Sequence, residues 1–199
     1  EAEVIEPGVP DAHPQVREER RAIAYAGSVK RHKGAHLLAE IAGDAPCHVF
    51  GGGDEDLLRA LRRHGNFTIH GYYRAGALPS LLARHGVGLV LLPSIVPESY
   101  SLTLSETWQA GAIAAALDHG AIAQRIREHG GGLLAPLASG AAGLREEVER
   151  WRRGSLMAVA PRAIATSDDA ARAHVALYRH LGFDQGPPAG GHGPQRSSA

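Results

Sequence analysis

The sequence has a single cysteine, no excess charge of either sign and no long hydrophobic run. Cys47 alone excludes an internal disulfide and a zinc site built from several thiolates, and it fits a reducing, cytosolic setting. Lysine plus arginine and aspartate plus glutamate both number 21, so the clustered positive charge of a nucleic-acid surface is not expected. No apolar run approaches the roughly 18 residues of a membrane span, and the acidic start has no secretory hydrophobic segment. We therefore expect a soluble protein, or a piece of one, without a membrane span.

Glycine and proline are abundant, at 25 and 12 residues, and they help to divide the chain into a central domain and two terminal segments. Residues 1–21 are polar and carry three prolines, which predicts a linker or arm. Residues 22–182 are expected to form one domain. Residues 183–199 lack the apolar side chains that would offset the entropy of ordering, so we predict a disordered tail.

Within the central domain, short apolar runs alternate with stretches of helical period, which is typical of βαβ units. The pattern predicts an α/β fold with a Rossmann-like, doubly wound and mostly parallel sheet of about six strands. In such sheets ligands bind beyond the carboxyl ends of the strands, where the strand order reverses. The expected strands are Ala22–Ala26, Cys47–Phe50, Phe67–His70, Val87–Leu92, Ala112–Ala116 and Gly132–Leu134, and the expected helices are Ala35–Ala42, Glu55–His64, Leu78–Arg84, Leu102–Ala110, Ala121–His129, Ala141–Trp151 and Asp168–Leu181.

Three loops that follow strands carry the candidate site: Gly27–Gly34, Gly51–Asp54 and Pro93–Ser101. The last of these leads into a helix, whose first backbone N–H groups and partial positive charge form a natural seat for phosphate. Tyr100, Ser101 and Leu102 would donate backbone N–H groups to a diphosphate, and Lys33 would approach it from the first loop. The alternative is that Ser99 or Ser101 only caps the helix and Lys33 is a solvated surface lysine.

Two glutamates flank this helix start. Glu98 precedes the helix and Glu106 lies two turns inside it, about 12 Å away if the whole span is helical. A carboxylate on each side of a diphosphate would accept hydrogen bonds from the hydroxyls of two sugars, which is the layout that a nucleotide sugar needs. The alternative for Glu106 is an exposed helix glutamate, but Leu102, Leu104 and Trp108 make this helix unusually apolar.

Other chemistries find little support in the sequence. Gly51–Gly53 lacks the G-x-G-x-x-G spacing and is interpreted as a sharp turn that lets a ligand approach the backbone. His32 and His36 have an i, i+4 spacing but no glutamate of a zinc helix between them, and the other histidines are scattered, so no metal site is expected. No G-x-S-x-G elbow is present, and Cys47 is expected to be an inert core residue.

The segment Glu98–Glu106 resembles the E-x7-E motif of retaining glycosyltransferases with the GT-B fold, in the large group-1 or family 4 class. Further segments are similar to the family's glycine and lysine-glycine loop, its second strand and turn, the loop that borders the base, and the stretches on either side of the motif. They are Gly27–Gly34, Val49–Gly53, His70–Tyr72, Leu91–Ser94, Trp108–Gly111 and Gly120–Ile122. The resemblance covers roughly Val4 to Leu181.

The resemblance implies a role for each matching residue. Lys33 and Glu98 would be catalytic: Lys33 would neutralise the departing diphosphate, and Glu98 would contact hydroxyls of the donor sugar. Glu106 would hold the ribose, and no metal or other cofactor is implied. The full set of implied donor-binding residues is Gly27, Ser28, Gly52, Tyr72, Ser99, Tyr100, Ser101, Leu102 and Glu106.

One position departs from the family's pattern. Ser28 stands where the family often has an arginine directly after the first-strand glycine. Either Lys30 or Arg31 compensates, or stabilisation of the leaving group is weaker than in typical members.

The family also implies the partners. The chain would be the C-terminal half of a GT-B enzyme, beginning at the interdomain linker Val4–Pro10, and its last helix with Tyr178 would pack toward the absent N-terminal domain. The donor would be a UDP- or GDP-sugar and the acceptor a glycan or lipid-linked molecule, in cytoplasmic cell-envelope polysaccharide or O-antigen synthesis, with a peripheral place at the inner face of the membrane. This part alone would not transfer sugar. Two alternatives stay open: a non-catalytic nucleotide-binding or scaffolding domain, and a GT-B sugar-nucleotide epimerase.

Overall fold

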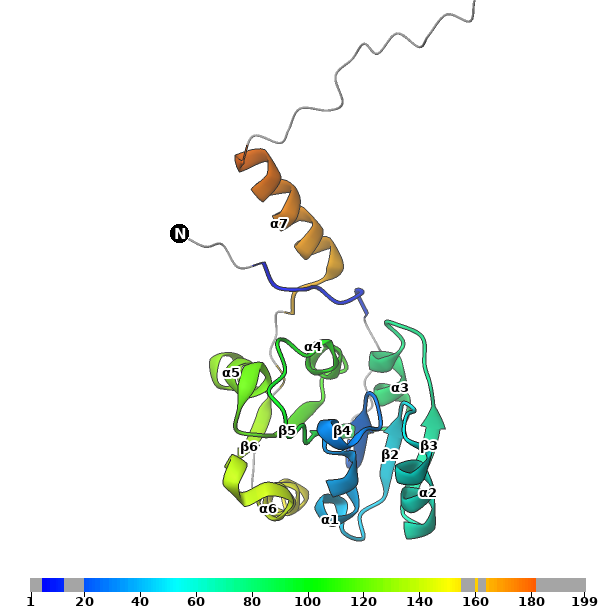
Figure 1. The fold of residues 1–199 in the computed structure, drawn as a ribbon. Coiled ribbons are helices and arrows are strands. Elements are labelled where there is room, and N and C mark those ends of the chain that lie inside the picture. Colours follow the sequence, from blue (N-terminus) through cyan, green and yellow to red (C-terminus); the bar gives the residue numbers. More distant parts are fainter. Residues whose placement is uncertain (1–4, 13–19, 155–159, 161–163, 182–199) are drawn as a thin grey trace, which may run out of the picture.

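The computed structural model describes residues 5–12, 20–154, 160 and 164–181 of the 199-residue chain. Its centre is a six-stranded sheet with the order β3-β2-β1-β4-β5-β6 and parallel pairing throughout (Figure 1). The predicted doubly wound α/β sheet is therefore confirmed, and its order reverses between β1 and β4. The strands are β1 Ala22–Ala26, β2 Cys47–Phe50, β3 Phe67–Gly71, β4 Val87–Leu92, β5 Ile113–Leu117 and β6 Gly132–Ala135.

Helices cover both faces of the sheet, which is why its strands are continuous apolar runs. All six residues of the central strand β4 are buried. One face packs against α1 Leu38–Ala42, α2 Glu55–His64 and α6 Gly140–Arg152. The other face packs against α3 Leu78–Arg84, α4 Leu102–Gln109 and α5 Gly120–His129.

The predicted helix Ala35–Ala42 is α-helical only in its second half. Two short 3-10 turns, η1 Arg31–Lys33 and η2 Ala35–Leu37, precede α1. Gly34 separates them in a left-handed conformation, with φ of 75°, so the chain turns sharply before a regular helix can begin. A third turn, η3 Leu137–Ser139, precedes α6.

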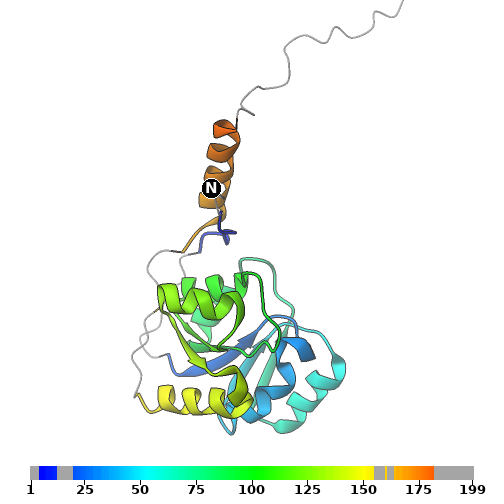
Figure 2. The same ribbon diagram turned by 60° about the vertical axis from the view of Figure 1, so that its left-hand side comes forward.

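The last helix, α7 Ser167–His180, stands away from the sheet and buries none of its residues (Figures 1 and 2). A capping box between Thr166 and Asp169 begins it. Val9 of the N-terminal segment is buried and pairs with Thr166 as an isolated parallel bridge. The predicted tail 183–199 and much of the predicted linker lie outside the described residues. None of the described helices is long and apolar enough to cross a membrane.

Candidate functional site

Two adjoining cavities open at the carboxyl ends of β1 and β4, where the strand order reverses. The smaller, of about 190 Å³, is lined by Lys33, Glu98 and Ser101 among others. The larger, of about 370 Å³, is lined by Tyr72, Leu102 and Glu106 among others. Both include Gly27 and Ser28 in their walls. Lys33, Glu98 and Glu106 thus lie around one backbone segment, in two adjoining hollows rather than a single pocket.

Loop-to-loop hydrogen bonds bring Lys33 to Glu98. The backbone N–H of Ile95 donates to the His32 carbonyl at 3.1 Å, which joins the loop after β4 to the loop after β1. Gly34 permits this approach, because a Cβ there would lie 1.9 Å from the Pro93 carbonyl oxygen. The Lys33 ammonium nitrogen consequently lies 2.9 Å from Glu98 Oε1, and both side chains are partly shielded from solvent. Lys33 is therefore a paired lysine in a cavity wall, not the solvated lysine of the alternative interpretation.

The loop after β4 is also held from the side of α5. The Ala121 N–H donates to the Glu98 carbonyl at 3.1 Å, and a ring nitrogen of His119 lies 2.7 Å from the Ser94 carbonyl oxygen. Gly120 packs closely on this loop, since a Cβ there would lie 3.0 Å from Pro97 Cα. With both flanks fixed, Glu98 is presented to the smaller cavity.

The first turn of α4 begins at Ser101 without a side-chain cap. Ser101 has φ of 72° and is the one non-glycine residue with positive φ among the described parts of the chain. Such a conformation costs roughly 1–2 kcal/mol and tends to be kept at functional sites. Because no serine side chain caps the helix, the leading N–H groups of α4 are available to a ligand at the wall that Ser101 and Thr103 form.

Arg125 holds this turn from behind, and sequence reasoning missed it. The buried guanidinium donates to the carbonyls of Tyr100 and Ser101 at 3.2 and 3.1 Å and to Ser105 Oγ at 2.8 Å. It also lies over the Tyr100 ring, 3.9 Å from its centroid, and near the Trp108 ring. The available signal was its position one helical turn after Ile122, on the buried side of α5.

Glu106 lies in the larger cavity with only 9% of its surface exposed. Burial raises the pKa of its carboxyl, and a hydrogen bond from the Gly76 backbone lowers it in part. The neighbouring Tyr73, which the sequence did not single out, has its pKa raised to about 12 by burial first and by the Glu106 charge second. The exposed-glutamate alternative for Glu106 is thus wrong.

The other predicted residues divide between the cavity walls and the outer surface. Gly52 lies under the Tyr72 ring, since a Cβ there would fall 2.5 Å from it, and Tyr72 itself is 84% exposed. Ser99 is exposed and outside both cavity walls. Tyr100 also lies outside them, and its hydroxyl donates instead to Glu6 at 3.4 Å.

The glycine turn also serves a purpose that was not predicted. A Cβ on Gly51 would lie 1.9 Å from the Gly27 carbonyl oxygen, and one on Gly53 would lie 2.3 Å from that of Val29. These two glycines therefore allow two loops of the protein to approach each other closely. Only Gly51 and Gly52 reach a cavity wall.

The charges around the cavities suit a ligand with an anionic centre and hydroxyl-bearing ends. Lys33 is the one lysine or arginine that lines either cavity in the described part of the chain, and neither Lys30 nor Arg31 joins it. Positive potential comes from Lys33 and the α4 N-terminus, while Glu98 and Glu106 supply hydrogen-bond acceptors in the two separate hollows.

No protein-family model and no curated protein sequence matches the chain. Solved structures do match its fold. The pneumococcal O-GlcNAc transferase GtfA, in complex with UDP and GlcNAc, has a TM-score of 0.61 and 17% identity over 89% of this chain and 39% of that one. AviGT4, a glycosyltransferase of avilamycin A biosynthesis, has a TM-score of 0.61 and 18% identity, over 90% of this chain and 58% of that one. Alr3699/HepE of Anabaena, in complex with UDP, has a TM-score of 0.57 and 18% identity, over 83% of this chain and 48% of that one. The chain thus has the fold found in one part of these glycosyltransferases, and it spans 39–58% of their lengths.

Proposed function

We propose that this chain is the donor-binding part of a retaining GT-B glycosyltransferase and that its two cavities together hold a UDP- or GDP-sugar. The observation that carries the proposal is the placement of Lys33 and the uncapped α4 N-terminus between two carboxylates, in hollows joined at Gly27 and Ser28. Two structural neighbours, HepE and GtfA, are complexes with UDP, which supports the proposal.

In this arrangement the nucleoside occupies the larger cavity, with Tyr72 beside the base and Glu106 accepting hydrogen bonds from the ribose. The diphosphate lies along Gly27 and Ser28, within reach of Lys33 and the first N–H groups of α4. The donor sugar then lies beside Glu98, which accepts hydrogen bonds from its hydroxyls.

Transfer breaks the bond between the anomeric carbon of the sugar and the diphosphate oxygen and forms a bond to an acceptor hydroxyl oxygen, whose proton passes to the departing diphosphate or to solvent. Lys33 and the α4 N-terminus stabilise the charge that develops on the diphosphate, so we propose that this step needs no metal ion. The acceptor, a glycan or lipid-linked molecule of cell-envelope synthesis in the cytoplasm, would be held by an N-terminal domain of the same parent protein. The chain alone would then bind donor without transferring sugar.

Calorimetric titration of the chain with UDP and GDP tests the proposal. Lys33→Ala should weaken binding roughly tenfold or more, because a charge-assisted hydrogen bond contributes about 1.5–3 kcal/mol. Glu106→Ala should also weaken it. The matched controls are Lys30→Ala and Glu40→Ala, which alter exposed side chains outside the cavity walls. Absence of heat at millimolar nucleotide, or equal losses in the controls, would contradict the proposal.

Glu98→Gln separates the diphosphate role of Lys33 from the sugar role of Glu98. The substitution releases Lys33 from its ion pair, so UDP should bind up to about fivefold more tightly, equivalent to about 1 kcal/mol. A UDP-sugar should gain less than UDP, because it loses a carboxylate acceptor. An equal gain for both ligands would place the sugar away from Glu98.

A non-catalytic nucleotide-binding domain is the second candidate. It is favoured by Ser28, which adds no positive charge, and by the pairing of Lys33 with Glu98, which leaves little net positive charge for a leaving diphosphate. Assay of the full-length parent for sugar transfer distinguishes the two: turnover that Lys33→Ala abolishes supports the transferase, and nucleotide binding without turnover supports the second candidate.

A further inference from the structure

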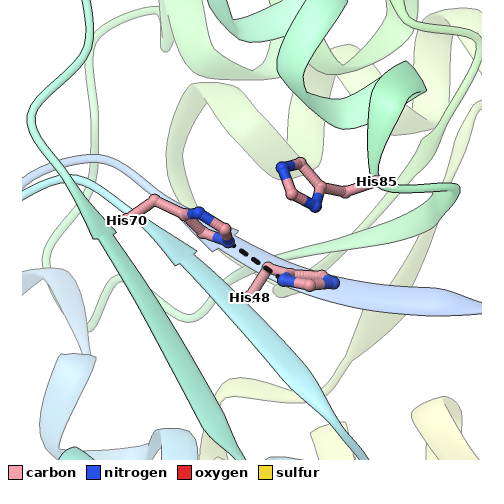
Figure 3. Close-up of side chains that lie close together, drawn as sticks. All are labelled: His48, His70 and His85. Carbon is pink, nitrogen blue, oxygen red and sulfur yellow. Dashed lines mark hydrogen bonds between the residues drawn. The ribbon is translucent and has the colours of Figure 1, made fainter.

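Three histidines from different elements meet on the α3 face of the sheet, outside the two cavities of the candidate site (Figure 3). His48 lies on β2, His70 on the neighbouring edge strand β3, and His85 directly after α3. One ring nitrogen of each lies within 4.8 Å of those of the other two. The sequence spacing concealed this group because strand pairing and the β3–α3 connection bring the residues together.

We propose that His48, His70 and His85 form a binding site for a divalent transition-metal ion, with Zn²⁺ the best-suited ion. Zn–N bonds of about 2.0–2.1 Å at tetrahedral angles place ligating nitrogens about 3.3 Å apart. His48 Nδ1 and His70 Nε2 are 3.0 Å apart, close to that spacing. The widest separation in the group, at most 4.8 Å, needs to close by about 1.5 Å, which is within reach of side-chain rotation at half-buried His85.

Packing against a buried aromatic side chain holds the His70 ring in place. The His70 ring stacks on Phe50, with centroids 4.5 Å apart and planes 12° apart, and Phe50 is fully buried. The 3.0 Å contact between His48 Nδ1 and His70 Nε2 places a proton on one of these two nitrogens, so that ring changes tautomer when both nitrogens bind the ion.

The site has room for a further ligand. In the described part of the chain the group has three members, so a fourth tetrahedral position stays open. His70 and His85 also line a cavity of about 470 Å³ that reaches Tyr72 and Tyr73. Three imidazoles with an open position form the donor set of a solvent-accessible zinc site, in which water fills the fourth place.

A bound ion would join the paired strands β2 and β3 to the end of α3. His70 belongs to the edge strand and is followed directly by the loop that carries Tyr72 and Tyr73, whereas His85 ends α3. Because the ion binds only when these elements are together, it should raise the unfolding temperature of the chain.

The test is titration of the 199-residue chain, carrying no affinity tag, with ZnCl₂ by calorimetry and with CoCl₂ by visible absorption. We expect one Zn²⁺ per chain with micromolar or tighter affinity, and the intense absorption of four-coordinate Co²⁺. His70→Gln and His85→Gln should each weaken binding at least tenfold and remove the rise in unfolding temperature. Their circular dichroism establishes that the variants are folded.

His36→Gln is the matched control, because it removes an exposed histidine and breaks the His32 and His36 pair. It should leave Zn²⁺ binding unchanged. The proposal is overturned if the folded parent chain binds no Zn²⁺ at 1:1, or if binding survives His70→Gln and His85→Gln, whatever the effect of His36→Gln. Metal binding and nucleotide binding are measured separately, so either proposal can fail without the other.

Discussion

Glu106 combines a stability cost with a proposed binding role. Its carboxyl is buried in the larger cavity wall, and burial raises its pKa above the ordinary 4.5. A carboxyl whose pKa is raised in the folded state favours folding fully below the unfolded pKa and opposes it as pH rises through the folded pKa. Ionising Glu106 therefore costs more free energy in the folded protein, where its carboxylate is buried, than in the unfolded chain, where water solvates it.

Glu106→Gln should stabilise the chain at pH 7 by about 0.5–1 kcal/mol, because the amide keeps an acceptor for the Gly76 N–H and carries no charge. The gain should shrink as pH falls toward 4.5, because a growing share of the wild-type carboxyls is then protonated in both states. Thermal unfolding of both proteins between pH 4.5 and 8 measures it, with Glu40→Gln as the exposed control. A gain that does not depend on pH would contradict the electrostatic explanation, and nucleotide affinity should fall in the same variant.

The residues that were predicted and those that were missed differ in how far their partners lie along the chain. Lys33, Glu98 and Glu106 were found because each lies on, or just after, a loop that follows a strand, where the topology of parallel sheets gathers ligands. Tyr73 and the three clustered histidines have their neighbours on other elements, far away along the chain. Nothing in local spacing records such contacts, and for the same reason the division of the site into two cavities was not foreseen.

At the scale of elements, apolar runs located all six strands to within one residue, because buried parallel strands are uniformly apolar. The helix expected at Ala35–Ala42 was placed less well. Its first half is not a regular helix because Gly34 has a positive φ and packs against Pro93 from a distant loop. Tertiary contact thus overrode local helix preference at the turn that presents Lys33.

Arg125 links two elements, since its side chain on α5 supports the first turn of α4. We expect Arg125→Met to lower UDP affinity about tenfold although Arg125 lies outside both cavity walls. The carbonyls of Tyr100 and Ser101 would lose their donor, and the strained Ser101 backbone would relax away from the ligand.

Calorimetry at a temperature well below unfolding separates this effect from lost stability. Arg125→Lys retains the charge without the planar donor fork and should recover little of the affinity. Arg127→Met, two residues further along α5 and exposed, is the matched control. Unchanged UDP affinity in folded Arg125→Met would show that Arg125 stabilises the fold without positioning the site.

At the scale of the whole molecule, packing is divided unevenly between the sheet and the last helix. Two clusters of buried side chains enclose the sheet. By contrast, α7 buries no residue and leaves Val175 and Tyr178 about half exposed. Its first turn is attached to the N-terminal segment: the Ser167 N–H donates to the Val9 carbonyl at 2.8 Å, and the Thr166 capping box closes this end of the helix.

Hydrogen exchange should therefore show two levels of protection in this chain. An isolated helix of fewer than about 12–15 residues is marginal in water, and the capping box adds only about 1 kcal/mol. We expect amides in the second half of α7 to exchange at least 100-fold faster than those of β4 and β5, whose opening requires the sheet to unfold. Mass spectrometry of peptides covering 171–180 and 87–92 measures the ratio. Equal protection of the two segments would mean that a contact with another part of the chain, or with a second copy, covers the apolar side chains of α7, and dilution of the sample distinguishes those two cases.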